Sequence, residues 1–145
     1  MKQSASARPL MLASLFLYTV REFSQNRERA NTGSANDLAR LLARLQKGEL
    51  LQPAQQTLLL SFMHRTMTGP NRLRRNLPAG TAVADKTGTG EAGVATNDVG
   101  IITLPNGKGH LAIAVLLSGS KLPIEAQEKV IAEIARAAYD SFAAL

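Results

Sequence analysis

The chain has 145 residues, of which 45% are apolar and 19% charged, and its formal net charge is +6 at pH 7. This length suits one domain with a real core. Cysteine is absent, which excludes a disulfide framework, a thiol nucleophile and thiolate metal sites. The basic residues are scattered except at Arg72, Arg74 and Arg75, and only two tyrosines and four phenylalanines are available for base stacking. Composition therefore argues against a nucleic-acid partner.

Residues 1–30 differ from the rest of the chain. Leu10 to Val20 is a nearly all-apolar run with Lys2 and Arg8 ahead of it. It is too short to span a bilayer but has the length of a signal-peptide core. No convincing small-residue cleavage site follows, so two interpretations stay open: an export signal, or a buried helix that continues into residues 21–29. We treat residues 1–30 as a divergent helical or signal-like segment and residues 31–145 as the main region.

Two helices are predicted next. Ser34 and Asp37 form a capping-box-like start, leucines follow at helical spacing, and Lys47-Gly48 supplies a stop. Pro53 suits the first turn of a second helix that runs to a breaker at Gly69-Pro70. The apolar residues of this helix that lead to the breaker are Leu58, Leu59, Phe62 and Met63. Residues 71–80 are predicted to be an irregular, basic connection.

The second half of the chain predicts strands and then a helix. Strands are expected at residues 81–87, 99–104 and 110–117, and the turn at residues 105–108 makes the last two antiparallel neighbours. Residues 124–145 predict a long helix. Its sheet-covering face is expected to hold Val130, Ile131, Ile134, Ala138 and Phe142. The fold class is therefore α/β (α+β), an antiparallel sheet of about three strands covered by a long C-terminal helix, with a helical N-terminal segment.

Lys86-Thr87-Gly88, followed by Thr89-Gly90, places a cation, a hydroxyl and an unhindered backbone at one point. Such a group can hold a substrate carboxylate beside a reacting carbonyl. Lys-Thr-Gly is one of three motifs of serine β-lactamases and penicillin-binding proteins, the others being Ser-x-x-Lys and Ser-Asp-Asn. No Ser-Asp-Asn occurs here. The single Ser-x-x-Lys, at residues 118–121, lies at a predicted strand end with Pro123 close behind, so Ser118 is not expected to be a nucleophile.

Residues 78–118 resemble the corresponding strands of class A serine β-lactamases, from the Lys-Thr-Gly strand through Asn97-Asp98 to the Pro-Asn-Gly-Lys turn. With the flanking helices the resemblance covers about residues 31–145, and residues 1–30 show none. It implies the C-terminal part of that fold and a small-molecule β-lactam substrate. It also implies no metal or organic cofactor and a periplasmic or secreted location. Composition predicts no nucleic-acid partner, and the short apolar run predicts no membrane span.

The resemblance also implies roles for individual residues. Lys86 would be the catalytic motif lysine whose ammonium attracts the substrate carboxylate, and Thr87 would add a hydroxyl bond to that carboxylate. Gly88 would allow close approach, and the Thr89 N–H would form half of an oxyanion hole. We expect Lys86, Thr87 and the Thr89 amide to line one concave surface facing residues 34–65.

Residues outside the motif are expected to be structural. Asn97 and Asp98 are interpreted as satisfying backbone groups near their strand. His64 and His110 are lone histidines without partner spacing, so no metal site is predicted.

Three functions stay open at this point. The complete family enzyme would acylate its serine with a β-lactam and hydrolyse the acyl-enzyme, whereas this chain alone is predicted to be inactive. The alternatives are a penicillin-binding or D-Ala-D-Ala peptidase relative, and a non-enzymatic remnant. The remnant would bind another polypeptide, because the strand at residues 110–117 is expected to lie at an open edge where the chain self-associates.

Overall fold

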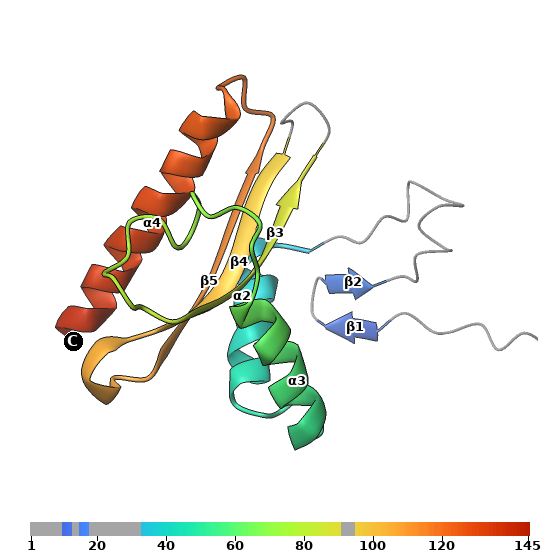
Figure 1. Cartoon of the computed structure of the whole chain (residues 1–145). Coiled ribbons are helices and arrows are strands. Elements are labelled where there is room, and N and C mark those ends of the chain that lie inside the picture. The colour runs from blue at the N-terminus through green and yellow to red at the C-terminus, as the bar shows by residue number, and fades with distance from the viewer. Residues whose placement is uncertain (1–9, 13–14, 18–32, 91–94) are drawn as a thin grey trace, which may run out of the picture.

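The computed structural model describes residues 10–12, 15–17, 33–90 and 95–145. Its centre is an antiparallel sheet of three strands in the order β3 (Val83–Thr89), β4 (Ala95–Thr103) and β5 (His110–Ser118). The helices α2 (Ala35–Gln46) and α3 (Pro53–His64) lie on one side, and α4 (Ile124–Ala144) lies on the other. Figure 1 shows this α+β arrangement, which confirms the predicted fold class.

The first helix begins as its sequence predicts. The Asp37 N–H donates to the Ser34 hydroxyl over 3.1 Å, and the Ser34 N–H is bonded back to the Asp37 carboxylate, so the capping box is complete. The helix ends before Lys47, and Gly48 follows with a φ of 77°. Such positive φ angles suit glycine, which has no Cβ to clash.

The second helix forms where the sequence predicts it, and its apolar residues are mostly exposed. Of Leu58, Leu59, Phe62 and Met63, only Met63 is buried, whereas Leu58 is 55% and Phe62 57% exposed. The helix packs beside β3, at the rim of the sheet, so just one of its rows reaches the core. It ends at His64, before the Gly69-Pro70 breaker, because Thr66 and Thr68 already bond to β3.

The central strand β4 pairs with both neighbours. Lys86 lies opposite Val99 in the β3–β4 ladder, and Val99 lies opposite Ala114 in the β4–β5 ladder. β4 and β5 are joined by a short 3₁₀ turn, η3 (Pro105–Gly107), in which Asn106 and Gly107 have φ angles of 58° and 72°. The strand β4 begins at Ala95, earlier than the sequence predicts, because polar residues at its start are also buried.

Two apolar clusters hold the layers together. One joins α4 to the sheet through residues such as Ile102 and Ile131, and the other joins α2 and α3 to it through Leu42, Met63 and Ile101. The predicted face of α4 is correct at Ile131 but wrong at Ile134 and Phe142, which are 42% and 48% exposed. Alanines face the sheet instead. The buried residues of α4 are Gln127, Ile131, Ala132, Ala135 and Tyr139.

Near the N-terminus, the strands β1 (Leu10–Leu12) and β2 (Leu15–Leu17) form a separate antiparallel pair. A helix across residues 10–17 is therefore the wrong expectation, because these backbones hydrogen-bond to each other instead. The rest of the expected helix, residues 18–29, lies outside the described residues. None of the helices in the described ranges is long and apolar enough to cross a membrane.

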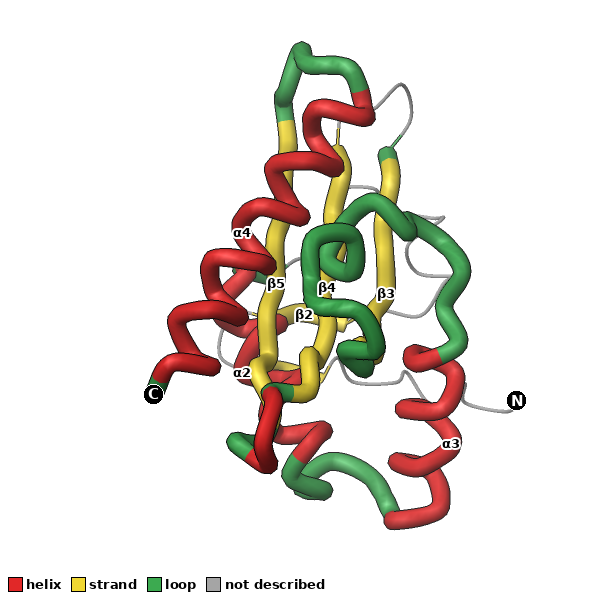
Figure 2. The backbone as a smooth tube through the Cα atoms, turned by 60° about the vertical axis from the view of Figure 1, so that its left-hand side comes forward, coloured by secondary structure: helices red, strands yellow, loops and turns green. Residues whose placement is uncertain are grey.

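Residues 65–82 connect α3 to β3, and we call them the crossing segment. Their structure is irregular, as predicted for residues 71–80, and they pass over the sheet on the same side as α4 (Figure 2). Leu73 of this segment is fully buried, and Arg72 is only 4% exposed. The crossing segment covers the parts of β3 and β4 where polar residues are buried and where the candidate site lies.

Candidate functional site

The Lys-Thr-Gly motif lies on the free edge of β3. The Gly90 N–H donates to the Ala95 carbonyl over 2.8 Å, and the Thr103 N–H donates to the Ala82 carbonyl over 2.9 Å. Bonded and non-bonded pairs alternate along an antiparallel ladder. The backbone groups of Thr87 and Thr89 therefore point away from β4, toward the open edge.

Side chains fill most of that edge. Among the outward carbonyls, that of Val83 accepts from Arg74 Nη2 over 2.8 Å and that of Asp85 accepts from the Thr66 hydroxyl over 2.8 Å. The Thr87 carbonyl accepts from Lys86 Nζ over 2.5 Å. The outward N–H of Thr89 has no acceptor among the described residues, so it remains available to a ligand.

The motif side chains alternate between the two faces of the sheet. Lys86 lies on the side of α2 and α3, two residues beyond the buried Ala84 of their cluster. Thr87 and Thr89 point to the opposite side, where they bond to Thr68 and Arg72. The expectation that the motif lines one surface facing residues 34–65 is therefore wrong for the side chains, because strand geometry separates neighbours. Lys86 Nζ nevertheless reaches the edge of β3, where it donates to the Thr87 carbonyl.

The threonine hydroxyls are oriented by the crossing segment. Thr87 Oγ1 lies 2.7 Å from Thr68 Oγ1. Gly69 permits this approach, since it has a φ of 58° and a Cβ there would lie 2.6 Å from Thr87 Cγ2. Thr89 Oγ1 accepts from Arg72 Nη2 over 2.7 Å. Because this oxygen acts as the acceptor, the Thr89 hydroxyl proton is free to point toward a bound anion.

Arg72 is the functional candidate that the sequence did not reveal. Its Nε donates to Glu128 of α4 over 3.0 Å, and its Nη1 donates to the Asn97 carbonyl over 2.9 Å. The same nitrogen lies 3.3 Å from the Gly88 carbonyl. One guanidinium thus ties β3, β4 and α4 together and fixes a positive charge behind Thr89. In the sequence, Arg72 stands out only as a member of the arginine cluster at residues 72–75. That cluster by itself indicates no more than a small basic patch.

A second ion pair lies next to it, and only its carboxylate is fully buried. Arg74 Nε donates to Asp85 Oδ1 over 2.7 Å, and Arg74 Nη2 contacts the same oxygen. Asp85 is fully buried, and burial raises its pKa although Arg74 opposes the rise. Asp85 directly precedes Lys86, so this pair fixes the start of the motif.

The structural roles expected for Asn97 and Asp98 are confirmed. Asn97 Oδ1 accepts from the Leu117 N–H over 3.0 Å, and Asp98 Oδ2 accepts from the Leu73 N–H over 3.2 Å. His64 also bonds to the backbone, since its Nδ1 lies 3.2 Å from the Val83 carbonyl oxygen. Each side chain joins neighbouring segments of the chain.

The Ser-x-x-Lys sequence is not on a helix. Ser118 ends β5, Gly119 has a φ of 66°, and Lys121 precedes the first turn of α4. The serine and the lysine are therefore not one helical turn apart, as a nucleophile and its base would be in that motif. No hydrogen bond links the Ser118 side chain to another described residue.

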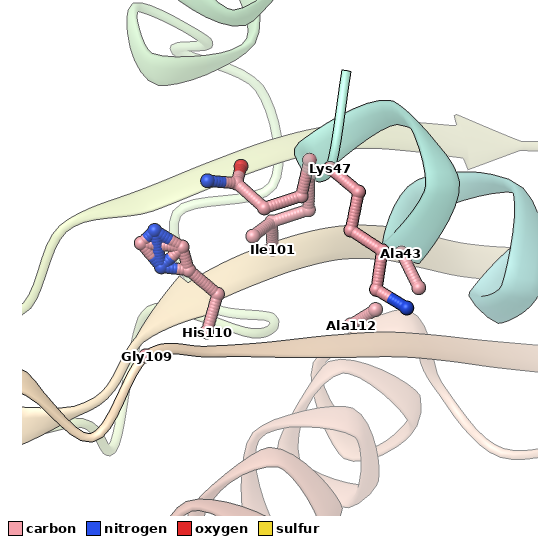
Figure 3. Close-up of a pocket in the computed structure, with 7 residues that line it drawn as sticks. Ala43, Lys47, Ile101, Gly109, His110 and Ala112 are labelled. Carbon is pink, nitrogen blue, oxygen red and sulfur yellow. The ribbon is translucent and has the colours of Figure 1, made fainter. Parts of the chain in front are cut away.

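A cavity of about 270 Å³ lies elsewhere, between the end of α2 and the start of β5 (Figure 3). Ala43, Ile101 and Ala112 make its apolar lining, and Lys47 and His110 lie at its rim. None of Lys86, Thr87 and Thr89 contributes to it. The motif edge is thus a surface site and not part of this cavity.

Comparison with known proteins places the chain in a family. The sequence model described as "Beta-lactamase enzyme family" matches residues 2–142. The match includes residues 2–30, for which sequence inspection found no resemblance. The extended-spectrum β-lactamase PER-1 of Pseudomonas aeruginosa is 42% identical over 113 residues, which are 75% of this chain and 36% of that protein. β-Lactamase VEB-1 of the same species is 41% identical over 100 residues, 66% of this chain and 33% of that protein.

Solved structures agree. The TLA-3 extended-spectrum β-lactamase superposes with a TM-score of 0.78 at 39% identity, over 90% of this chain and 50% of that one. A class A β-lactamase from Bacteroides cellulosilyticus DSM 14838 superposes with a TM-score of 0.79 at 27% identity, over 89% and 48%. Fold and motif thus define a class A serine β-lactamase-like chain. The chain belongs to the β-lactamase enzyme family, and it spans about half the length of these solved relatives.

Replacing Arg72 tests its place in this site. Arg72→Met removes the guanidinium but leaves Glu128 and two carbonyl groups without their donor. Loss of one partner of a buried ion pair costs about 3–5 kcal/mol, and we expect that loss in the free energy of urea unfolding. Arg136→Met is the control, because its pair with Asp140 is 46% and 53% exposed and is worth about 0–1 kcal/mol. Equal losses in the two variants would contradict the assignment.

Proposed function

We propose that this chain supplies the carboxylate-binding edge of a β-lactam site, and that the complete family fold hydrolyses the β-lactam ring and so gives antibiotic resistance. Family membership supports the substrate class. The observation that carries the proposal is the β3 edge, where the Thr89 N–H points outward beside two threonine hydroxyls and the Lys86 ammonium. We also propose a periplasmic or secreted location, as the resemblance implies.

The edge offers an anion three kinds of contact. Lys86 Nζ is exposed and is held at the edge by the Thr87 carbonyl. A charge-assisted hydrogen bond from such an ammonium contributes about 1.5–3 kcal/mol. The Thr87 and Thr89 hydroxyls can donate to the same carboxylate, with Arg72 behind them as a fixed positive charge. The Thr89 N–H is the donor of the group that the family resemblance assigns to a developing oxyanion.

Acyl transfer needs more than this edge. A serine must lie within reach of a base, and hydrolysis of the acyl-enzyme needs a positioned water. Ser118 ends a strand and does not supply that pair. We therefore propose that the chain by itself binds small carboxylates weakly and does not turn over β-lactams at a family-like rate.

Binding of a simple anion tests the edge. Sulfate added to the isotope-labelled chain should shift the backbone amide resonances of residues 86–90 in a saturable way. In Lys86→Ala this response should weaken about tenfold or more, the value expected for one charge-assisted contact. Lys121→Ala removes a charge from an exposed position outside the motif and should leave the response unchanged. Equal weakening in both variants would mean that only net charge matters.

Turnover of a chromogenic cephalosporin tests the second half of the proposal. The purified chain should show no saturable hydrolysis above that of a mock purification. Lys86→Ala and Ser118→Ala preparations serve as comparisons. Turnover that disappears in Ser118→Ala would show that Ser118 is a nucleophile after all.

The open edge of β5 favours a second candidate function, association with another copy of the chain. Among the described strands of the main sheet, β5 pairs with β4 alone. The Leu104 N–H donates to the Gly109 carbonyl over 2.9 Å, so ladder alternation directs the backbone groups of Ala112, Ala114 and Leu116 outward. Unpaired strand backbone of this kind is a template for another strand.

Sedimentation measures this association directly. The wild-type chain should show a weight-average mass that rises with concentration. Leu116→Lys places a charge beside the edge, where Leu116 is 38% exposed, and should hold the chain closer to a monomer. Leu122→Lys, at a 56% exposed position outside the sheet, should behave as wild type. A wild-type chain that stays monomeric at every concentration would refute the idea.

A further inference from the structure

A cavity lies between α2 and β5, away from the Lys-Thr-Gly edge (Figure 3). Ala112 of β5 lies opposite Ile101 of β4 in the ladder, so their side chains share the face of the sheet that α2 covers. Ala43 of α2 completes this apolar lining. Two of these three residues carry only a methyl group, which leaves a volume of about 270 Å³ between the helix and the sheet.

The volume and the lining suit a small apolar group. In another protein, an apolar cavity of about 150 Å³ binds benzene, so the cavity here has room for a ring with a polar substituent. Small-molecule sites typically combine an apolar lining with a few polar groups that orient the ligand. The polar groups around the cavity therefore decide which ligand it takes.

Three polar side chains around the cavity have no partner among the described residues. They belong to Gln46 and Lys47 of α2 and to His110 at the start of β5, and Figure 3 shows Lys47 and His110 flanking Ile101. An ammonium and an amide NH₂ are hydrogen-bond donors, and a neutral imidazole carries one N–H. The cavity therefore offers donors to a ligand, and the one charged residue of its lining, Lys47, is positive.

The end of α2 is shielded, although a helix C-terminus normally carries negative partial charge. Each of its last four carbonyl groups has a donor, so no orphan acceptor is left there. The N–H groups of residues 47, 48 and 49 donate to the carbonyls of residues 43, 45 and 44, and Gln56 Nε2 donates to the Gln46 carbonyl. The Glu49 carboxylate accepts from Arg44 over 3.1 Å, and none of the lining residues is acidic. The lining is therefore open to a negative group beside Lys47.

We propose that this cavity binds a small monocarboxylate whose body is an apolar ring or short chain. The body packs against Ala43, Ile101 and Ala112, which removes its apolar surface from water. The carboxylate stays at the rim, where it accepts hydrogen bonds from the Lys47 ammonium and the His110 ring. The site is separate from the β3 edge proposed for β-lactams, because none of residues 86–89 lines the cavity.

Benzoate, acetate and benzyl alcohol together test this site. Benzoate carries both the ring and the carboxylate, and each of the other two carries one of these features. Benzoate added to the isotope-labelled chain should shift the amide resonances of Lys47, Ile101 and Ala112 in a saturable way. Acetate and benzyl alcohol should need concentrations at least about tenfold higher for the same shift. An acetate response confined to residues 86–90 belongs to the β3 edge, so failure of one proposal is distinguishable from failure of the other.

Two variants and a control separate the charge from the cavity. Lys47→Met removes the ammonium from an exposed side chain and should weaken benzoate binding about tenfold, the value of one charge-assisted contact. Lys121→Met is the control, because it removes the same charge from an exposed position that does not line the cavity, and it should bind benzoate as the wild type does. Ala112→Leu fills the space beside Ile101 and should abolish the cavity response. The amide spectrum of this variant should otherwise match that of the wild type, which shows that it is folded.

Three results would overturn the proposal. The first is a wild-type chain in which benzoate causes no saturable shift at residues 43–47 and 110–112, which line the cavity. The second is benzyl alcohol that binds as tightly as benzoate, since the carboxylate would then contribute nothing. The third is a shift at these residues that grows with protein concentration before any benzoate is added, because a second copy of the chain would then occupy the cavity. All three are measured on the wild-type chain, so they decide the question even where Ala112→Leu does not fold.

Discussion

The structure depends on how the segment between α3 and β3 is held against the sheet. Its only fully buried apolar residue is Leu73, which is flanked by two arginines whose guanidinium groups enter the polar ends of β3 and β4. Each arginine reaches a carboxylate and at least one backbone carbonyl. Charge brought into a low-dielectric layer is tolerated only when it is paired in this way. The crossing segment is thus fixed by specific bonds more than by apolar contact.

This constraint also sets the character of the β3 edge. The outward carbonyls of β3 bond to side chains of α3, the crossing segment and Lys86. Thr68 and Arg72 hold the hydroxyls of Thr87 and Thr89 in place. A ligand at this edge therefore meets donors whose positions are already determined, which reduces the entropy lost on binding.

Sequence reasoning succeeded where local rules dominate. The capping box at Ser34, the turn at Asn106-Gly107 and the antiparallel order of the strands follow from short-range chemistry. It failed where tertiary packing decides. Ile134 and Phe142 are apolar but exposed, and Asp85, Thr96 and Asp98 are polar but buried. Arg72 was visible only as part of a basic cluster. Nothing in a single sequence shows that it pairs with Glu128, which lies 56 positions away. The motif itself was found because its residues are contiguous.

The glycines around the motif separate what the fold requires from what a ligand would require. A Cβ at Gly100 would lie 2.8 Å from the Ala84 carbonyl, and one at Gly69 would collide with Thr87. Packing alone explains these two glycines. At Gly88 the nearest atom to such a Cβ is Asn97 Cβ at 3.8 Å, an ordinary contact, and Gly88 is exposed. Packing against the described residues therefore does not explain glycine at position 88, and the proposed close approach of a ligand to the β3 edge would.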